Sequence, residues 1–309
     1  MSSSIESVEL RQALRDAVER LTRERVPSPR LNAELLIMFT LDCNRAYLYA
    51  HPERELTPDE VSRYDDAIAR RITGVPAQYI TGHQEFWGLD LIVSPGVLIP
   101  RPETERVVET VLELAGDLTL ARDHERRAGA SVPRELHIID IGTGSGAIAL
   151  ALAKELPSAE IHASDISVEA LEIAKANAAR HELDSRIRFH RGDLFAGLSE
   201  VAALTGQFDF VVSNPPYVGE SEEDQVQLDV RKFEPRNAVF AGPTGVEAIE
   251  RLIPQAEKAL CPGGWLVIEI SSSIVDGVRR LLSRWDEASV RNDLQGIARV
   301  AVARRRGST

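Results

Sequence analysis

One tetrapeptide of this chain has residue types that could hold a flat amino group: Asn214-Pro215-Pro216-Tyr217. An Asn side chain presents its oxygen and its NH2 group in one plane. The prolines fix φ at about −65° and lack an N–H, so carbonyl oxygens dominate the turn. A planar –NH2 group could donate to the Asn214 oxygen and the Pro215 carbonyl while Tyr217 covers its face. The tetrapeptide thus indicates a site for an amide or aromatic amino nitrogen; a merely rigid turn is the alternative.

A glycine-rich loop, Gly142-Thr143-Gly144-Ser145-Gly146, lies upstream of this tetrapeptide, between the apolar run 136–141 and an apolar helical pattern. Glycines let a backbone turn sharply and approach a ligand closely. A dinucleotide is one candidate ligand, but the loop is one residue shorter than the dinucleotide fingerprint. Asp140, just before the loop, would oppose a pyrophosphate. A ligand with a cationic methionine end, S-adenosylmethionine, would tolerate this carboxylate.

Further candidates follow the next two predicted strands. Asp165 ends the run Ile161–Asp165, where a carboxylate can accept both hydroxyls of a ribose. Its alternative role is to help start a helix at Ser167. Asp193 and Leu194 follow the third strand and could contact the amino group and face of an adenine, or they could form a polar turn; their position fits both. Together these residues predict an S-adenosylmethionine pocket at the carboxyl ends of parallel strands.

A parallel sheet is needed to bring these candidates together, and the pattern from residue 136 predicts one. Strands are expected at 136–141, 159–165, 186–190, 207–213 and 263–270, and helices near 146–156, 167–181 and 245–260. This alternation is typical of an α/β fold with crossover helices. After residue 106 a helix of about three turns is expected, with its apolar side at Val107, Val108, Val111, Leu112 and Leu114. The segment 117–134 lacks an apolar period and is expected to be a solvated linker.

The N-terminal part has a different pattern. Residues 5–72 show apolar positions at helical spacing, and 86–93 is typical of a hairpin. We therefore expect three parts: a helical domain at 1–73, a hairpin linker at 74–95 and a catalytic domain at 96–309.

Composition and charge narrow the class of protein. The chain has 309 residues, of which 43% are apolar and 27% charged, as in ordinary globular proteins. No apolar stretch reaches the roughly 18 residues of a spanning helix, and the N-terminus lacks a secretory pattern. Cys43 and Cys261 are expected to be reduced thiols in a cytoplasmic protein. The net charge of −12 argues against a large duplex-DNA footprint, and the seven histidines lack metal spacing. We expect no metal, nucleic acid or membrane partner.

With these motifs in hand, the chain resembles class I methyltransferases that modify amino groups and, more narrowly, the peptide chain release factor glutamine methyltransferases (HemK/PrmC family). The resemblance covers nearly the whole chain and rests on Pro76–Gly82, Glu85–Gly88, Val97–Glu105, Asp140–Gly146, Ser213–Tyr217, Phe233–Arg236 and Asp293–Gly296. The chain departs from the family at Ser271–Ser273 (often Gly and then Gln), at Thr244 (usually Asp) and at Ala298 (often Asp).

The resemblance implies a Rossmann-like class I methyltransferase sheet with a small N-terminal helical domain joined by a β-hairpin. It implies that the turn 214–217 holds the glutamine amide of a Gly-Gly-Gln loop in a release factor, with Tyr217 packed on that amide. The loop 142–146 and Asp165 would hold S-adenosylmethionine, with Asp193, Leu194 and Asn214 also in contact with it. The block 101–105 would abut the methionine end; it also fits a helix start.

The sequence places no His or Lys beside the turn to act as a base. We therefore expect catalysis by orientation, with both amide N–H groups held and the nitrogen lone pair aimed at the methyl carbon. Three alternatives remain: a glutamine of a ribosomal protein as the substrate, an adenine amino group of a nucleic acid, and an idle module that binds a release factor. The acidic charge disfavours the second, and the intact Asn214 and glycine loop disfavour the third. The helical domain would recognise the partner or simply pack on the catalytic domain.

Overall fold

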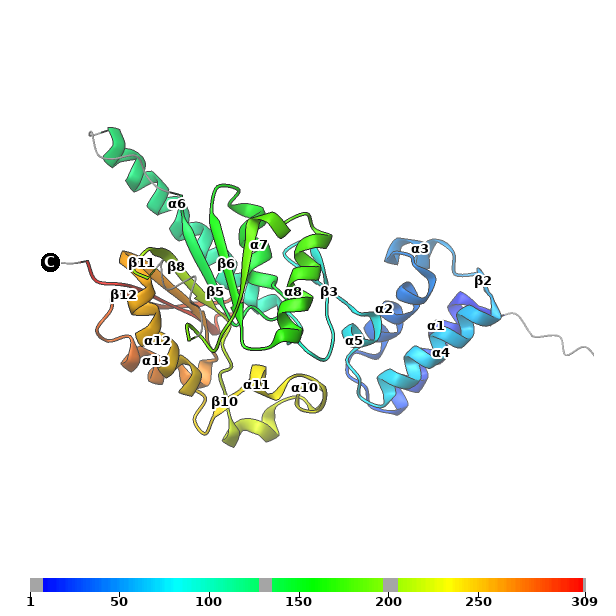
Figure 1. Cartoon of the computed structure of the whole chain (residues 1–309). Coiled ribbons are helices and arrows are strands. Elements are labelled where there is room, and N and C mark those ends of the chain that lie inside the picture. The colour runs from blue at the N-terminus through cyan, green and yellow to red at the C-terminus, as the bar shows by residue number, and fades with distance from the viewer. Residues whose placement is uncertain (1–7, 128–134, 197–204, 308–309) are drawn as a thin grey trace, which may run out of the picture. The chain divides into compact units, whose positions relative to one another are not determined.

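The chain divides into two compact units, which are described here one at a time. The computed structural model describes residues 8–127, 135–196 and 205–307 (Figure 1). One unit consists of the residues up to His83 together with Gln227–Phe233. The other consists of Gln84–Val226 and the residues from Glu234 onward. The domain limits predicted at residues 73 and 95 stay a prediction.

The first unit is helical, as the periodicity predicts. Its elements are β1 (Val8–Glu9), α1 (Leu10–Arg23), α2 (Pro29–Leu41), α3 (Arg45–Ala50), β2 (Glu55–Leu56), α4 (Pro58–Ile72) and α5 (Ala77–Thr81). Apolar residues at helical spacing, among them Leu21, Leu36 and Ile68, are fully buried. The start of α4 is fixed by a capping box, in which Thr57 and Glu60 satisfy each other's backbone N–H groups.

A short segment from the second half of the chain also belongs to the helical unit. This segment contains α10 (Leu228–Phe233). The guanidinium of Arg71, of which 5% is exposed, bonds Asn32 Oδ1 at 2.8 Å and contacts Asp229 Oδ2 at 3.5 Å. A Cβ built on Gly74 would lie 3.3 Å from Phe233 Cε2, so the Phe233 ring packs closely against Gly74. The chain therefore returns to the helical unit shortly after the turn 214–217.

The second unit is built on a seven-stranded sheet in the order β12-β13-β11-β8-β5-β6-β7. The strands are β5 (His137–Ile141), β6 (Glu160–Asp165), β7 (Ile187–Arg191), β8 (Phe208–Ser213), β11 (Leu260–Glu269), β12 (Asp286–Asn292) and β13 (Ala298–Arg304). The strands β7, β6, β5, β8 and β11 are mutually parallel, whereas β13 runs antiparallel to both of its neighbours, β11 and β12. The expected α/β fold with a mostly parallel sheet is confirmed, including all five predicted strands.

Helices cover both faces of this sheet (Figure 1). One face carries α6 (Glu105–Arg127), α7 (Ala147–Glu155) and α8 (Val168–Arg180), and the other carries α12 (Glu247–Ala259) and α13 (Val275–Leu281). Neighbouring strand residues contribute to opposite cores: Ile138 packs with the first group of helices and Ile139 with the second. Such alternation follows from the two-residue period of a strand.

Smaller elements complete this unit. The predicted hairpin is present as β3 (His83–Phe86) and β4 (Leu89–Ile92), and β9 (Val218–Gly219) pairs with β10 (Phe240–Gly242). The 3-10 turns are η1 (Pro102–Thr104), η2 (Asp184–Arg186), η3 (Glu220–Gln225) and η4 (Ser272–Ile274), and α11 spans Arg236–Val239. No helix in the described part of the chain is long and apolar enough to cross a membrane.

Two expectations about the region after residue 106 are wrong. The helix expected to last about three turns is the 23-residue α6, and the linker expected at 117–134 is helical as far as Arg127. This segment is rich in Leu, Ala, Arg and Glu, which favour a helix without needing an apolar face. Residues 128–134 of the expected linker lie outside the described residues. Strands β12 and β13 were not predicted.

Candidate active site

A cavity of about 490 Å³ lies at the carboxyl ends of β5, β6 and β8. Its walls come from several loops, which contribute Pro95–Leu98, Pro100, Thr104, Ile141–Ser145, Asp165–Ser167, Gly192–Leu194, Ser213–Pro216 and Pro235 among others. The structure thus brings together in one cavity most of the site residues predicted from the sequence. Among those predicted residues, Gly146 and Tyr217 do not line it.

The glycine loop is held by its own backbone. The N–H groups of Gly142 and Thr143 donate to the Ser164 carbonyl at 2.8 and 2.9 Å, which ties the loop to β6. Gly142 and Gly144 have φ of 74° and 56°, and a Cβ built on either would meet nothing within 4 Å. These two glycines therefore leave open space where a side chain would stand.

Gly146 has a different environment from the other two glycines. Its φ is 86°, and a Cβ there would lie 2.8 Å from Leu150 Cδ1 and 3.2 Å from Ala174 Cβ. The absence of a side chain lets α7 and α8 pack closely at the start of α7. Its contact with a cofactor stays a prediction.

Asp165 lies at the cavity and beside the start of a helix, while its contact with a ribose stays a prediction. It lines the cavity, and its carboxylate accepts the Gly144 N–H at Oδ2 and the Ser167 N–H at Oδ1, both at 2.9 Å. Ser167 in turn caps α8. Burial raises the pKa of this carboxyl, and the backbone hydrogen bonds oppose the rise.

Asp193 and Leu194 also line the cavity. The Asp193 carboxylate accepts a bond from Arg251 at 2.5 Å, and its carbonyl accepts the Ala196 N–H at 3.0 Å. Leu194 has a φ of 56°, in the left-handed region. The two residues therefore form a polar turn and face the cavity at the same time.

Asp140 lies beneath the glycine loop and outside the cavity lining. It is 1% exposed, and its Oδ2 accepts the Thr143 hydroxyl at 2.6 Å. Burial raises the pKa of Asp140 to about 7, the Thr143 hydrogen bond opposing this. The hydrogen bond to Thr143 therefore ties Asp140 to the glycine loop above it.

The turn after β8 is held by side chains from distant parts of the chain. Asn214 Nδ2 donates to Thr104 Oγ1 at 3.2 Å, and the Tyr217 hydroxyl donates to Glu269 Oε1 at 2.9 Å. Burial raises the pKa of the Tyr217 phenol, which therefore stays protonated. Gly245 lets its own strand–helix loop approach the turn, since a Cβ there would lie 2.6 Å from the Tyr217 carbonyl oxygen. Glu269 and Gly245 were not among the predicted site residues, whereas Thr104 belongs to the block 101–105 that was expected to abut the methionine end.

The block 101–105 both starts a helix and borders the site. Pro102 stands in the first turn of η1, which leads into α6, so the helix-start interpretation is confirmed. Glu234, 6% exposed, accepts the Ile99 N–H at 3.1 Å and the Arg101 guanidinium at 2.5 Å. Val97, Leu98, Pro100 and Thr104 line the cavity, whereas Arg101 does not.

The lining residues limit the chemistry that the cavity can perform. No His or Lys is among the described residues that line it, and no cluster of metal-ligating side chains exists in the described ranges. At Thr244, where the chain departs from the family pattern, the hydroxyl and the backbone N–H both donate to Glu247 Oε1 at 2.8 Å, next to the start of α12. The described lining therefore offers open backbone and the carboxylates of Asp165, Glu169 and Asp193, but no imidazole or amine that could act as a base.

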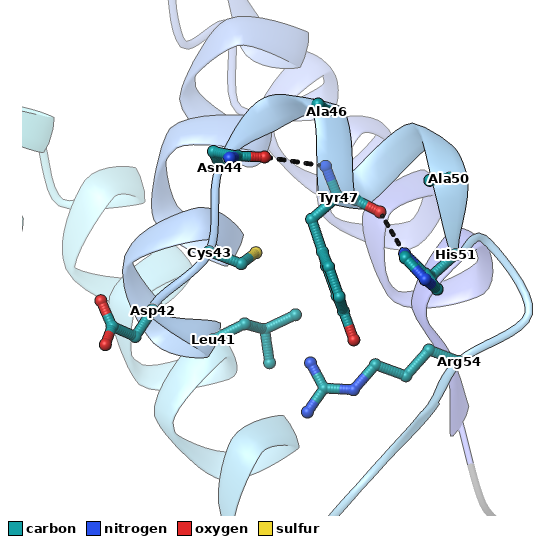
Figure 2. A pocket seen from close by; sticks show the side chains of 9 residues that line it. All are labelled: Leu41, Asp42, Cys43, Asn44, Ala46, Tyr47, Ala50, His51 and Arg54. Atoms are coloured by element: carbon teal, nitrogen blue, oxygen red, sulfur yellow. Dashed lines mark hydrogen bonds between the residues drawn. The ribbon is translucent and has the colours of Figure 1, made fainter.

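A second cavity, of about 740 Å³, lies in the helical unit and contains no predicted site residue (Figure 2). The Tyr47 ring stacks on His51 with 4.2 Å between ring centroids. Asn44 accepts the Tyr47 N–H, and Arg54 is paired with Glu60. Asn44 and Arg54 therefore have partners within the helical unit.

Comparison with known proteins matches both parts of the chain. Residues 12–82 match the family model of the PrmC N-terminal domain, and residues 130–231 match that of the methyltransferase small domain. The release factor glutamine methyltransferase of Koribacter versatilis is 52% identical over 298 residues, which cover 96% of this chain and 98% of that protein. The protein of the same name from Moorella thermoacetica is 42% identical over 301 residues, covering 96% and 99%.

Solved structures support the fold. The hMettl16 catalytic domain in complex with MAT2A 3′UTR hairpin 6 has a TM-score of 0.54 over 86% of this chain and 93% of that chain, at 16% identity. At this level of identity the likeness concerns the fold alone. It agrees with the predicted Rossmann-like methyltransferase sheet.

Proposed function

The chain belongs to the release factor glutamine methyltransferase family, and we propose that it methylates the side-chain amide nitrogen of the glutamine in the Gly-Gly-Gln loop of peptide chain release factors. S-adenosylmethionine is the methyl donor. The observation that carries the proposal is one cavity that joins the glycine loop 142–145 to the turn 214–216. Since release factors act in translation, we place the reaction in the cytoplasm.

The first part of the proposal concerns cofactor binding. The open space at Gly142 and Gly144 and the Asp165 carboxylate suit a ligand that carries a ribose and an amino-acid end. We assign the ribose hydroxyls to Asp165, the adenine to Asp193 and Leu194, and the methionine end to the loop 142–146. When bound, the cofactor supplies a methyl group on a positively charged sulfur.

The second part concerns the glutamine amide. An amide nitrogen is a weak nucleophile because its lone pair is delocalised into its carbonyl. We propose that Asn214 Oδ1 and the Pro215 carbonyl accept its two N–H groups, with Pro216 and Tyr217 shaping the turn. Alignment of this kind can contribute about 7–11 kcal/mol in the best cases. The same hydrogen bonds strengthen as the nitrogen becomes positive, which favours the transition state over the ground state.

The third part concerns the proton that the nitrogen loses. The cavity lining contains no His or Lys in the described residues. We therefore propose that no side chain removes the proton before methyl transfer. Once the nitrogen carries the methyl group it is acidic, and its surplus proton passes to water.

The fourth part concerns recognition of the release factor by the helical region. Leu31, Phe39 and Tyr49 expose 56%, 49% and 57% of their surface in the helical unit. Large exposed apolar side chains are typical of protein interfaces. We expect Phe39→Asp to lower kcat/KM on an intact release factor and to leave the rate on a short peptide with the Gly-Gly-Gln loop unchanged. Equal loss on both substrates would contradict a recognition role.

A direct experiment tests the proposed function. The purified protein is incubated with radiolabelled S-adenosylmethionine and four acceptors: a release factor, the same factor with asparagine for the loop glutamine, ribosomal proteins, and duplex DNA. We expect label in the unaltered release factor alone. Label in ribosomal proteins but not in the release factor would show that a ribosomal protein is the substrate. Label in DNA would overturn the proposed chemistry.

A further inference from the structure

One helix borders the end of the cavity that we assign to the adenine. Ala248 and Arg251 of α12 are among the residues that line the cavity. Residues three apart lie on one face of a helix, so this face of α12 borders the cavity beside Asp193, to which Arg251 is bonded. Neither Ala248 nor Arg251 was predicted as a site residue. The structure therefore adds a helix to a site that the sequence builds from strand ends alone.

Two side chains of α12 hold the turn that follows β7. Arg251 Nη2 donates to Asp193 Oδ2 at 2.5 Å. Four residues further along the helix, Gln255 Oε1 accepts the Phe195 N–H at 3.3 Å, and Gln255 Nε2 donates to the Arg251 carbonyl at 2.8 Å. The turn is thereby bonded to α12 on both sides of Leu194.

The residue between these two bonds has an unfavourable backbone conformation. Leu194 has a φ of 56°, in the left-handed region that residues with a side chain rarely adopt. Such a conformation is costly, and it persists only where the surrounding structure holds it, often at ligand sites. The Asp193 carbonyl closes the turn by accepting the Ala196 N–H at 3.0 Å. The bonds to α12 therefore help to hold a strained turn in one shape at the cavity.

The bond from Arg251 gives the two oxygens of the Asp193 carboxylate different partners. Both oxygens of a carboxylate can accept hydrogen bonds. Arg251 binds Oδ2, so a donor on a ligand can be accepted at Oδ1. The 6-amino group of adenine is such a donor, and a purine without this group offers none there. An Asp193 side chain without the Arg251 bond would have to be ordered when the ligand binds, which lowers affinity.

Resting on the proposed function, which assigns the adenine of S-adenosylmethionine to Asp193 and Leu194, we propose that Arg251 is a positioning residue. It fixes the Asp193 carboxylate so that one oxygen accepts the 6-amino group. It thereby makes the cofactor site selective for a purine that carries this group. Because Arg251 acts through Asp193, its effect falls on the affinity for the cofactor and not on the methyl transfer step.

The exposure of the ion pair sets the size of the expected effect. The side chains of Arg251 and Asp193 are 58% and 45% exposed. Water screens such a pair, so its loss changes an equilibrium only about two- to fivefold. A hydrogen bond between the carboxylate and the amino group is stronger, and its loss changes affinity about 10- to 100-fold. Loss of Arg251 should therefore remove part of the selectivity, and loss of Asp193 nearly all of it.

Two ligands separate the amino group from the rest of the cofactor. S-adenosylhomocysteine is what remains of S-adenosylmethionine after methyl transfer, and its 6-deamino analogue carries hydrogen in place of the amino group. Calorimetry gives the Kd of both ligands. We expect the wild type to bind S-adenosylhomocysteine about 10- to 100-fold more tightly than the analogue, and Asp193→Ala to bind both alike. Arg251→Met should lose about two- to fivefold of the preference, with an unchanged Kd for the analogue.

Arg180→Met is the matched control. Arg180 Nη2 bonds Asp90 Oδ2 at 2.6 Å, and the two side chains are 44% and 50% exposed. Neither residue is among the described residues that line the cavity. We expect this variant to keep the preference of the wild type. Because Arg251 acts through Asp193, the double variant Arg251→Met/Asp193→Ala should bind both ligands as Asp193→Ala does.

Several results would overturn the positioning role. They are an unchanged preference in Arg251→Met, an equal loss of affinity for both ligands, a further loss in the double variant, and the same change in Arg180→Met. A full preference in Asp193→Ala would overturn the adenine assignment and the role with it. None of these measurements uses a release factor. Failure of the wild type to methylate a release factor, with binding as expected, would therefore count against the proposed function alone.

Discussion

The two halves of the cavity are held in place by different means. On the glycine-loop side, the donors are backbone N–H groups: Gly142 and Thr143 donate to the Ser164 carbonyl, and Gly144 donates to the Asp165 carboxylate. On the side of the turn, the bonds are made between side chains. Asn214 and Thr104 are 110 residues apart in the sequence, and Tyr217 and Glu269 are 52 apart.

This difference has a consequence for substitutions. A loop held by its own backbone keeps its course when a side chain is changed, unless the change adds a Cβ where space is lacking. A turn held by distant side chains can lose its hydrogen-bond orientation through a single substitution. We therefore expect changes on the turn to affect turnover and changes on the loop side to affect cofactor binding or stability.

The largest effect is expected for Asn214→Ala. This change removes the oxygen that we assign to the substrate amide, and loss of one oriented hydrogen-bond group in an active site costs on the order of 10²- to 10³-fold in kcat. The Kd for S-adenosylmethionine, measured by calorimetry, should change little. Asn292→Ala, an exposed position on β12, is the matched control. A parallel loss of cofactor affinity would show that Asn214 serves mainly the cofactor.

Asp165→Asn should weaken cofactor binding and leave turnover unchanged, which is the reverse of the result expected for Asn214→Ala. The amide keeps the shape of the carboxylate, but one acceptor becomes a donor, so either Gly144 or Ser167 loses its partner and the ribose loses a charged acceptor. A hydrogen bond to a charged group contributes about 1.5–3 kcal/mol, and we expect the Kd for S-adenosylmethionine to rise about tenfold to a hundredfold. Turnover at saturating cofactor should remain near wild type. A fall in kcat with an unchanged Kd would remove the distinction between the two sides.

Two glycines of the same loop should separate stability from binding. At Gly146 an added Cβ meets Leu150 at 2.8 Å, whereas at Gly142 it meets nothing within 4 Å. We expect Gly146→Ala to lower the free energy of unfolding by about 1–3 kcal/mol, from overpacking and the positive φ. Gly142→Ala carries only the cost of its φ, about 1 kcal/mol. Urea titration of both variants measures the difference; a greater loss at Gly142 would contradict the packing role of Gly146.

The two sides also differ in how far the sequence alone could predict them. The glycine loop and Asp165 follow apolar strands directly, and the order of strand, loop and helix predicts their meeting at one sheet edge. Asn214 was predicted in the same way. The bond from Asn214 to Thr104 depends on how α6 begins beside β8, which no local pattern specifies. For Glu269 the sequence contains one signal, because a charged residue directly follows the apolar run 265–268.

The C-terminal strands β12 and β13 were not predicted from the sequence, and the exposure of β12 shows why. β12 lies at the edge of the sheet, and most of its residues are exposed. An edge strand with no buried face lacks the alternation of apolar and polar residues by which strands are predicted. The extension of α6 to Arg127 was missed for a related reason, because its sequence favours a helix by propensity and not by an apolar stripe.

The smallest effect is expected for Tyr217→Phe, which tests how the turn is divided between its two hydrogen bonds. The ring keeps its packing, and only the bond from the phenol to Glu269 is lost. The bond from Asn214 Nδ2 to Thr104 Oγ1 remains, so the orientation of the Asn214 amide should survive. A typical hydrogen bond contributes about 0.5–1.5 kcal/mol, which corresponds to a fall in kcat of roughly 2- to 13-fold. Initial rates at saturating S-adenosylmethionine and release factor measure it. A loss as large as that of Asn214→Ala would mean that the phenol holds the turn and that the bond from Asn214 to Thr104 is secondary.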